Sequence, residues 1–195
     1  MKTALRSLSA ELRGEADRVI YGKGLLAMLE EYGEPHVSGS YALDLMVWRD
    51  LDVYLAADLM SEARFFELGG RLAETLAVSR MHFRNERLAQ TAGLPRGLYW
   101  GVYFDLMEDI HWKLDIWCVP RDECRRLLTH CQEIQGALTD GSRDAILAIK
   151  SACWQHPEYR SGFSSQDIYK AVIVDGIETV DEFRKHLLEG KGISV

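Results

Sequence analysis

Two aspartates separated by one residue, Asp50 and Asp52, are the part of the sequence best suited to chemistry. They belong to the run Asp50-Leu51-Asp52-Val53, whose alternation of charged and apolar residues is typical of a β-strand. Alternate side chains of a strand share a face, so both carboxylates point one way while Leu51 and Val53 point to the core. Like charges this close raise each other's pKa unless a cation lies between them. The spacing therefore predicts a metal site.

Magnesium is the metal that this arrangement favours. It takes oxygen ligands and usually combines one or two carboxylates with phosphates of a substrate. A phosphate-binding element should therefore lie nearby, and Gly39-Ser40 precedes the aspartates in the sequence. Glycine lets the backbone approach a phosphate closely, and the Ser40 amide and hydroxyl can donate hydrogen bonds to it. Alone, this pair is more often an ordinary turn; beside two aspartates it indicates a nucleoside triphosphate (NTP) site.

A third carboxylate, Asp115, lies in the otherwise apolar run from Leu114 to Ile116. An unpaired buried carboxylate costs several kcal/mol, and a metal ion with a substrate hydroxyl would offset that cost. Lys113 shares the face of Asp115 on a strand, so we expect it to stabilise phosphate charge. Arg49, directly before Asp50, either contacts the triphosphate or is solvated.

Gly-Ser, a short spacer, Asp-x-Asp and a later isolated aspartate together resemble the nucleotidyltransferases of the DNA polymerase β-like superfamily, in particular the small-substrate, antibiotic-modifying type. The resemblance covers about residues 35–120. It implies that Gly39 and Ser40 bind the NTP phosphates, that Asp50 and Asp52 hold two Mg²⁺ ions, and that Asp115 holds the second ion and accepts the proton of the acceptor. The sequence departs from the family pattern at two positions: it has Asp44 where many members have glycine, and Arg49 where many have serine.

The resemblance implies an enzyme that transfers a nucleoside monophosphate from an NTP such as ATP to a hydroxyl of a small-molecule acceptor, releasing pyrophosphate. A protein side chain and a tRNA end remain alternative acceptors. From a different functional class, the chain could be a binding module or toxin–antitoxin component that keeps the fold without turnover. Retention of all three aspartates argues against that alternative.

The overall charge bears on the choice of acceptor. The 195 residues carry a formal net charge of −7 and no block of Lys and Arg, which weakens any general attraction for phosphate chains. We therefore expect a small acceptor and consider nucleic acid an unlikely partner. The four cysteines form no C-x-x-C pair, and we find no signal peptide or membrane-spanning run, so a cytoplasmic protein is expected.

Hydrophobic periodicity predicts the elements that position these residues, in an α+β fold with a mixed sheet flanked by helices. We expect a catalytic domain over residues 1–120 and a C-terminal helical domain over 121–195. The expected segments are helices over about 3–31 with a break at Gly22 to Gly24, strands over 36–38 and 51–56, a helix after Ser61, strands over 81–88, 98–107 and 111–119, and helices near 122–135, 142–155, 165–174 and 180–189.

Two smaller groups of residues allow two interpretations. Tyr99, Trp100, Tyr103 and Phe104 are expected to pack in the core, although they could stack on a base or an acceptor. The predicted turn at 108–109 carries two acidic residues that are more often solvated than part of an acceptor pocket.

Overall fold

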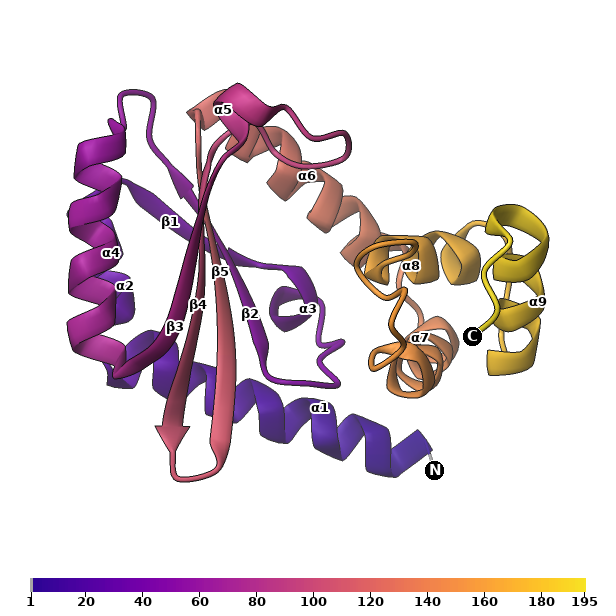
Figure 1. Ribbon diagram of the computed structural model, residues 1–195. Coiled ribbons are helices and arrows are strands. Elements are labelled where there is room, and N and C mark those ends of the chain that lie inside the picture. The colour runs from indigo at the N-terminus through magenta and orange to yellow at the C-terminus, as the bar shows by residue number, and fades with distance from the viewer. Residues whose placement is uncertain (1) are drawn as a thin grey trace.

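A computed structural model, which describes residues 2–195, shows a five-stranded sheet with helices on both faces (Figure 1). This confirms the α+β class. The elements in chain order are α1 (Lys2–Asp17), the π-helix η1 (Arg18–Gly22), α2 (Leu25–Glu30), β1 (Glu34–Ser38), α3 (Gly39–Ala42), β2 (Asp50–Ala56), α4 (Glu62–Leu76), β3 (Val78–Asn85), α5 (Glu86–Ala89), β4 (Leu98–Met107), β5 (Ile110–Val119), α6 (Arg121–Ala137), α7 (Asp140–Cys153), α8 (Ser165–Ile173) and α9 (Val180–Lys191).

The strands lie in the order β1-β2-β5-β4-β3. Neighbouring strands are antiparallel except β2 and β5, which run parallel at the centre of the sheet. In that central pair Asp52 lies opposite Asp115, and Asp50 lies opposite Lys113. The sheet topology therefore brings together carboxylates that are far apart in the sequence.

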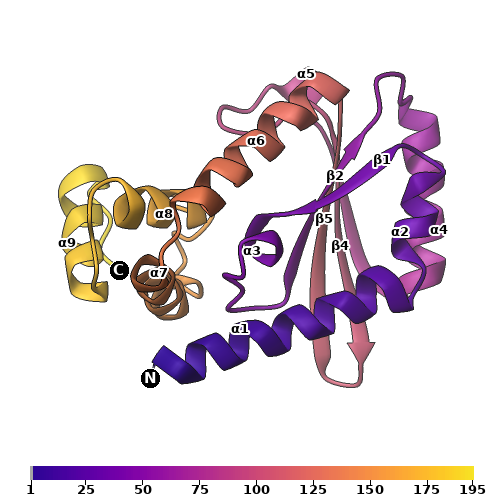
Figure 2. The same ribbon diagram turned by 180° about the vertical axis from the view of Figure 1, so that it is seen from behind.

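The main core lies between the sheet and the helices α2 and α4, which cover one face (Figures 1 and 2). Phe65, Leu68, Leu72 and Leu76 recur at helical spacing on α4 and are fully buried. Ser61 caps this helix by accepting a hydrogen bond from the Arg64 amide, as its sequence position predicts. The opposite face of the sheet, which carries the three aspartates, is turned toward α3 and the C-terminal helices.

A second core joins α7, α8 and α9 to the loop before β2. Leu43, Leu45 and Val47 from that loop pack with the helices, for example with Ile149 and Phe183. The helix α1 reaches from the sheet toward this second core (Figure 2). Packing thus links residues 39–49 to the C-terminal helices, and the division into domains at residue 120 stays a prediction.

Most expected helices and strands are present, with boundary shifts of a few residues. The helix break near Gly22 and Gly24 is present as η1 followed by a left-handed Gly24 at φ 69°. The strand expected over 81–88 instead spans Val78–Asn85, because the Asn85 side chain accepts a hydrogen bond from the Arg87 amide and begins the short helix α5. At the start of α9, the side chains of Thr179 and Glu182 form a capping box.

No helix in residues 2–195 combines the length and apolar character needed to cross a lipid bilayer. The four cysteines of the protein are free thiols, and Cys118, Cys124 and Cys153 are buried.

Candidate functional site

The three aspartates share one face at the centre of the sheet. On β2, Leu51, Val53 and Leu55 are buried on the core side, which leaves Asp50 and Asp52 on the other. On β5 the same alternation places Asp115 beside Asp52 across the parallel pair. The sequence-predicted carboxylates are thus brought together by strand alternation and by the register between the two strands.

Two cations lie among these carboxylates. The Lys113 ammonium lies 3.5 Å from Asp50 Oδ1 and also contacts the Asp115 carboxylate. Arg160, from the loop between α7 and α8, donates from Nη2 to Asp50 Oδ2 at 2.8 Å. The hydroxyl of Tyr99 on β4 donates to Asp115 Oδ1 at 2.6 Å. Asp50 and Asp115 are thus paired with cations, whereas Asp52 forms no ion pair with any of the described residues.

Burial and mutual repulsion act most strongly on Asp52. Burial first, and then the charges of Asp50 and Asp115, raise the pKa of Asp52 to about 7. Burial and Asp50 also raise the pKa of Asp115, although Lys113 and Tyr99 oppose that change. When all three aspartates are ionised, their negative charge exceeds the positive charge of Lys113 and Arg160.

The backbone of Gly39 packs directly against the Asp52 carboxylate. It follows β1 at φ 60°, a left-handed conformation that glycine adopts without strain, and a Cβ at this position would overlap the Asp52 carboxylate. Ser40 is the next residue and is half-buried. The helix α3 that they begin has only four residues, so its dipole adds little. Gly39 and Ser40 therefore lie beside Asp52, as the sequence predicts.

The structure does not bring Arg49 to the aspartates. Its guanidinium donates two hydrogen bonds to Glu15 of α1, from Nε at 2.6 Å and from Nη2 at 2.9 Å. This pair raises the pKa of Arg49 and lowers that of Glu15. Arg49 ties α1 to the end of the loop before β2, and Lys113 is the predicted cation that lies at the site.

Sequence reasoning missed Lys150, which is fully buried on α7. Its ammonium donates to the Leu45 carbonyl at 2.7 Å and to the Tyr169 hydroxyl at 3.3 Å. Burial lowers the pKa of Lys150 to about 7, and the charges of Asp50 and Asp52 oppose this effect. A lone lysine at the end of the apolar run 145–149 was a visible signal in the sequence.

Arg160 and Tyr99 were also missed as site residues. Arg160 has no signal in the sequence, because only the folding of the loop between α7 and α8 brings it to β2. Tyr99 and Tyr103 belong to the aromatic group expected in the core, and alternation divides that group: Trp100 and Phe104 face the core, whereas the two tyrosines lie on the site face. The core interpretation is correct for half of the group.

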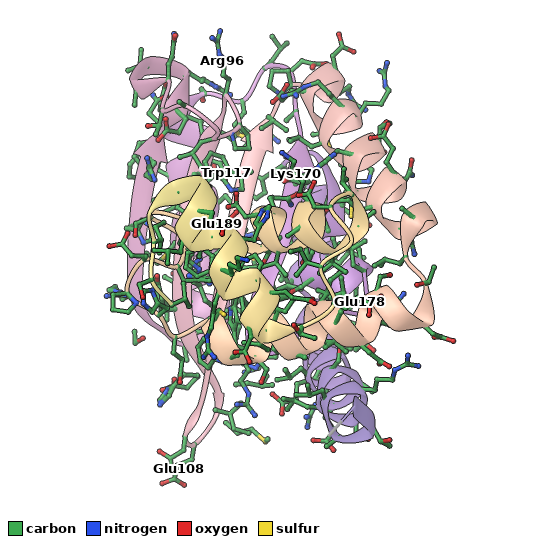
Figure 3. All side chains as sticks on the ribbon, turned by 90° about the vertical axis from the view of Figure 1, so that its right-hand side faces the viewer. Arg96, Glu108, Trp117, Lys170, Glu178 and Glu189 are labelled. Atoms are coloured by element: carbon green, nitrogen blue, oxygen red, sulfur yellow. The ribbon has the colours of Figure 1, made fainter. Side chains whose placement is uncertain are left out.

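The residues at positions 108 and 109 are solvated, as expected. Figure 3 shows Glu108 at the tip of the β4–β5 hairpin, at the far end of the molecule from Arg96. Both residues of this turn are exposed. They lie away from the carboxylates and form no part of the site.

The three carboxylates of Asp50, Asp52 and Asp115 suit a Mg²⁺ ion whose remaining ligands come from the substrate. Asp50 Oδ1 is a buried oxygen without a hydrogen-bond partner among the described residues, and its neighbour Asp52 is destabilised by repulsion. Within residues 2–195, no three carboxylate, imidazole or thiol side chains form a ready ligand set. Mg²⁺ usually takes one or two carboxylates together with phosphate oxygens, so an incomplete protein ligand set is what a nucleotide-dependent site would provide.

Comparison with solved structures identifies similar folds. A cytoplasmic RNA terminal U-transferase matches with a TM-score of 0.56 at 14% identity, over 87% of this chain and 53% of that one. The GLD-2/RNP-8 complex matches with 0.53 at 10% identity, over 89% and 64%. Cid1, an RNA terminal uridylyl transferase, matches with 0.55 at 16% identity, over 87% and 52%. This chain therefore spans less than two thirds of each of these chains.

No protein-family profile matches the sequence, and no curated protein does. The structural matches correct one expectation, that nucleic acid is an unlikely partner: two of these proteins are named for transfer to RNA ends, and none of the three supports a small-molecule acceptor. The expectation was wrong because it used a net charge summed over the whole chain, which does not describe the field at one site. At identities of 10% to 16% the matches establish the fold alone, and this chain shares the fold of the corresponding part of these three structures.

Proposed function

We propose that this protein is a Mg²⁺-dependent nucleotidyltransferase that moves a nucleoside monophosphate from an NTP to a terminal hydroxyl of an RNA acceptor. The observation that carries the proposal is the group formed by Asp50, Asp52 and Asp115 on adjacent parallel strands, with Gly39 against Asp52. The RNA acceptor is suggested by the printed descriptions of proteins that share the fold.

Each residue of the site has a defined task in this proposal. Asp50 and Asp52 hold two Mg²⁺ ions, and Asp115 shares the second. When bound, these ions neutralise phosphate charge and lower the pKa of the attacking hydroxyl. Gly39 and Ser40 donate backbone and hydroxyl hydrogen bonds to the triphosphate. The ammonium of Lys113 and the guanidinium of Arg160 balance part of the charge of the NTP.

The reaction is a displacement at the α-phosphorus. The acceptor hydroxyl oxygen forms a bond to the α-phosphorus. The bond between the α-phosphorus and the oxygen that bridges it to the β-phosphate breaks, and pyrophosphate leaves with that oxygen. Asp115 accepts the hydroxyl proton, and its raised pKa suits that task. Tyr99 and Lys113 hold the Asp115 carboxylate in place. Positioning and charge stabilisation provide the rate enhancement.

Thermal unfolding with ATP, GTP, CTP and UTP, each with and without Mg²⁺, tests the nucleotide site. A ligand at a hundredfold excess over its Kd stabilises the native state by about 2.7 kcal/mol, which a thermal shift detects. We expect one or more NTPs to stabilise the wild type only with Mg²⁺ and to lose this effect in Asp52→Asn. Asp109→Asn, in the exposed hairpin turn, is the matched control and should keep it.

Pyrophosphate release in the presence of a single-stranded oligoribonucleotide then tests transfer. We expect elongation of the oligonucleotide by the wild type and none by Asp52→Asn. If no NTP shows a Mg²⁺-dependent shift, the proposal fails. If NTPs bind but no pyrophosphate is released with any acceptor, the chain is a binding module with this fold.

A further inference from the structure

We propose that the exposed side of β3 and β4 beside Asp115 binds the terminal nucleotides of the RNA acceptor. The surface consists of Arg80, His82 and Tyr103, and is called the β3–β4 surface below. This inference rests on the proposed function and names the residues that hold its acceptor.

The register of the sheet connects this surface to the carboxylates. Asp115 lies opposite Gly101 on β4, which in turn lies opposite His82 on β3. One row along, Lys113 lies opposite Tyr103. These residues share the face that carries the aspartates, because directly opposed residues of neighbouring strands point to the same side. His82 is two strands from Asp115, or about 10 Å, which is within reach of one nucleotide.

The His82 ring lies flat on the sheet because Gly101 leaves room for it. A Cβ at Gly101 would overlap the imidazole ring and the Tyr99 hydroxyl. The ring centroid lies 5.3 Å from that of Tyr99 and 6.0 Å from that of Tyr103. His82 is nevertheless exposed to solvent. It is therefore an aromatic ring held between two others and accessible for stacking with a base.

Imidazole charge is disfavoured at this position. Partial burial is the largest cause that lowers the pKa of His82. The charge of Asp115 opposes this effect, and the nearby cations Lys113, Arg80 and Arg84 add to it. A neutral imidazole ring that is exposed on one side is suited to stack on a base.

The Arg80 guanidinium is positioned without a carboxylate partner. It lies over the Tyr103 ring, 3.9 Å from the centroid. No Asp or Glu of residues 2–195 lies within ion-pair distance of it, whereas Arg84 on the same strand pairs with Glu86 at 2.5 Å. A guanidinium held in place on an aromatic ring can bind a phosphate or stack on a base. Arg80 therefore supplies the charge that an RNA backbone requires.

The surface continues away from the site into a hollow. This hollow has a volume of about 350 Å³ and runs from Arg80 and Tyr103 to Asp105 and His111. Aromatic rings combined with a cation and a groove are the usual means by which proteins bind single-stranded nucleic acid. The path from Asp115 over His82 and Arg80 therefore suits an acceptor whose terminal hydroxyl reaches the carboxylates.

Binding of a fluorescently labelled, single-stranded oligoribonucleotide tests the inference without requiring turnover. We expect His82→Ala to weaken binding about ten- to a hundredfold, in the range of a lost base–aromatic stack. Arg80→Gln should weaken binding and reduce the slope of log K against log salt by about 0.7, which corresponds to one lost phosphate contact on a single strand. Arg80→Lys should restore the slope and only part of the affinity.

Arg64→Gln is the matched control. Arg64 also lies over a tyrosine ring, that of Tyr32 at 5.5 Å, but it belongs to α4 on the opposite face of the sheet. This variant changes the net charge equally and should bind the oligoribonucleotide like the wild type. Mg²⁺-dependent stabilisation by NTP should be unchanged in all four variants.

Two results separate this inference from the proposed function. Equal oligoribonucleotide affinity and salt slope in Arg80→Gln, His82→Ala and Arg64→Gln would overturn the β3–β4 surface while leaving nucleotidyl transfer intact. Absence of oligoribonucleotide binding by a wild type that still binds Mg²⁺ and NTP would overturn the RNA acceptor and with it this surface. Selective loss in the Arg80 and His82 variants supports it.

Discussion

Arg160 donates a hydrogen bond of 2.8 Å to the carboxylate of Asp50, although 110 positions separate the two residues in the sequence. Arg160 adopts φ 75°, an uncommon backbone conformation for a residue other than glycine, and its amide donates to the Phe163 carbonyl at 2.6 Å. The loop between α7 and α8 is thus folded so that a C-terminal cation reaches the strand that carries Asp50 and Asp52.

We expect Arg160→Gln to impair NTP use far more than stability. The Arg160 side chain is 45% exposed and the Asp50 side chain 11%, and Lys113 stays beside Asp50 in the variant, so loss of the Arg160 ion pair should cost on the order of 1 kcal/mol. The KM for NTP should rise at least tenfold, because the variant lacks a charge that we propose to lie beside the triphosphate. Steady-state kinetics and thermal unfolding measure the two effects. A strongly lowered melting temperature with an unchanged KM would show that Arg160 is structural.

Gly39→Ala should destroy the nucleotide site. The new Cβ would overlap the Asp52 carboxylate, and alanine at φ 60° is strained by about 1 kcal/mol or more. We expect loss of Mg²⁺-dependent NTP stabilisation in thermal unfolding. The control is Gly14→Ala in α1, where nothing lies within 4 Å of the added Cβ and a stabilisation of about 0.5–1 kcal/mol is expected. Normal NTP binding by Gly39→Ala would remove Gly39 from the site.

The pH dependence of stability without divalent metal should report the charge on Asp52. Its pKa is about 7 in the folded protein and about 3.9 when unfolded, so between these values the native state holds more protons. The free energy of unfolding of the wild type should therefore fall as pH rises from 4 to 7, by at most about 1.4 kcal/mol per pH unit. Urea titrations with a chelator should show a smaller fall in Asp52→Asn. Identical curves would mean that Asp52 is not under electrostatic strain.

Lys150 should produce the opposite slope at higher pH. Burial lowers its pKa to about 7 from an unfolded value of about 10.4, so in this window the unfolded state holds more protons. Its contribution to the free energy of unfolding should rise from pH 7 to 9, and this rise should be absent from Lys150→Met in urea titrations. Lys170→Met, at an exposed position on α8, is the control and should retain the wild-type slope. The same slope in both variants would show that Lys150 remains charged when folded.

Local sequence patterns were sufficient to predict most helices and strands and the aspartates at the centre of the site. Strand alternation predicted that Asp50 and Asp52 share a face, and the small size of Gly39 indicated a close approach of the backbone to phosphate. These features depend on neighbours in the chain, so local spacing is sufficient to predict them. The strand expected over 81–88 shifted because capping by Asn85 outweighed strand propensity in its last residues.

Long-range packing selects the other groups that surround the aspartates. The parallel register of β2 and β5 places Asp115 beside Asp52, and it would be lost by a slip of one residue. Arg49 turned to Glu15 rather than to the aspartates, whereas Lys150 and Arg160 came in from the C-terminal helices. Long-range packing chooses among charged side chains whose local sequence is equally compatible with several partners, and for that reason spacing alone could not identify these cations.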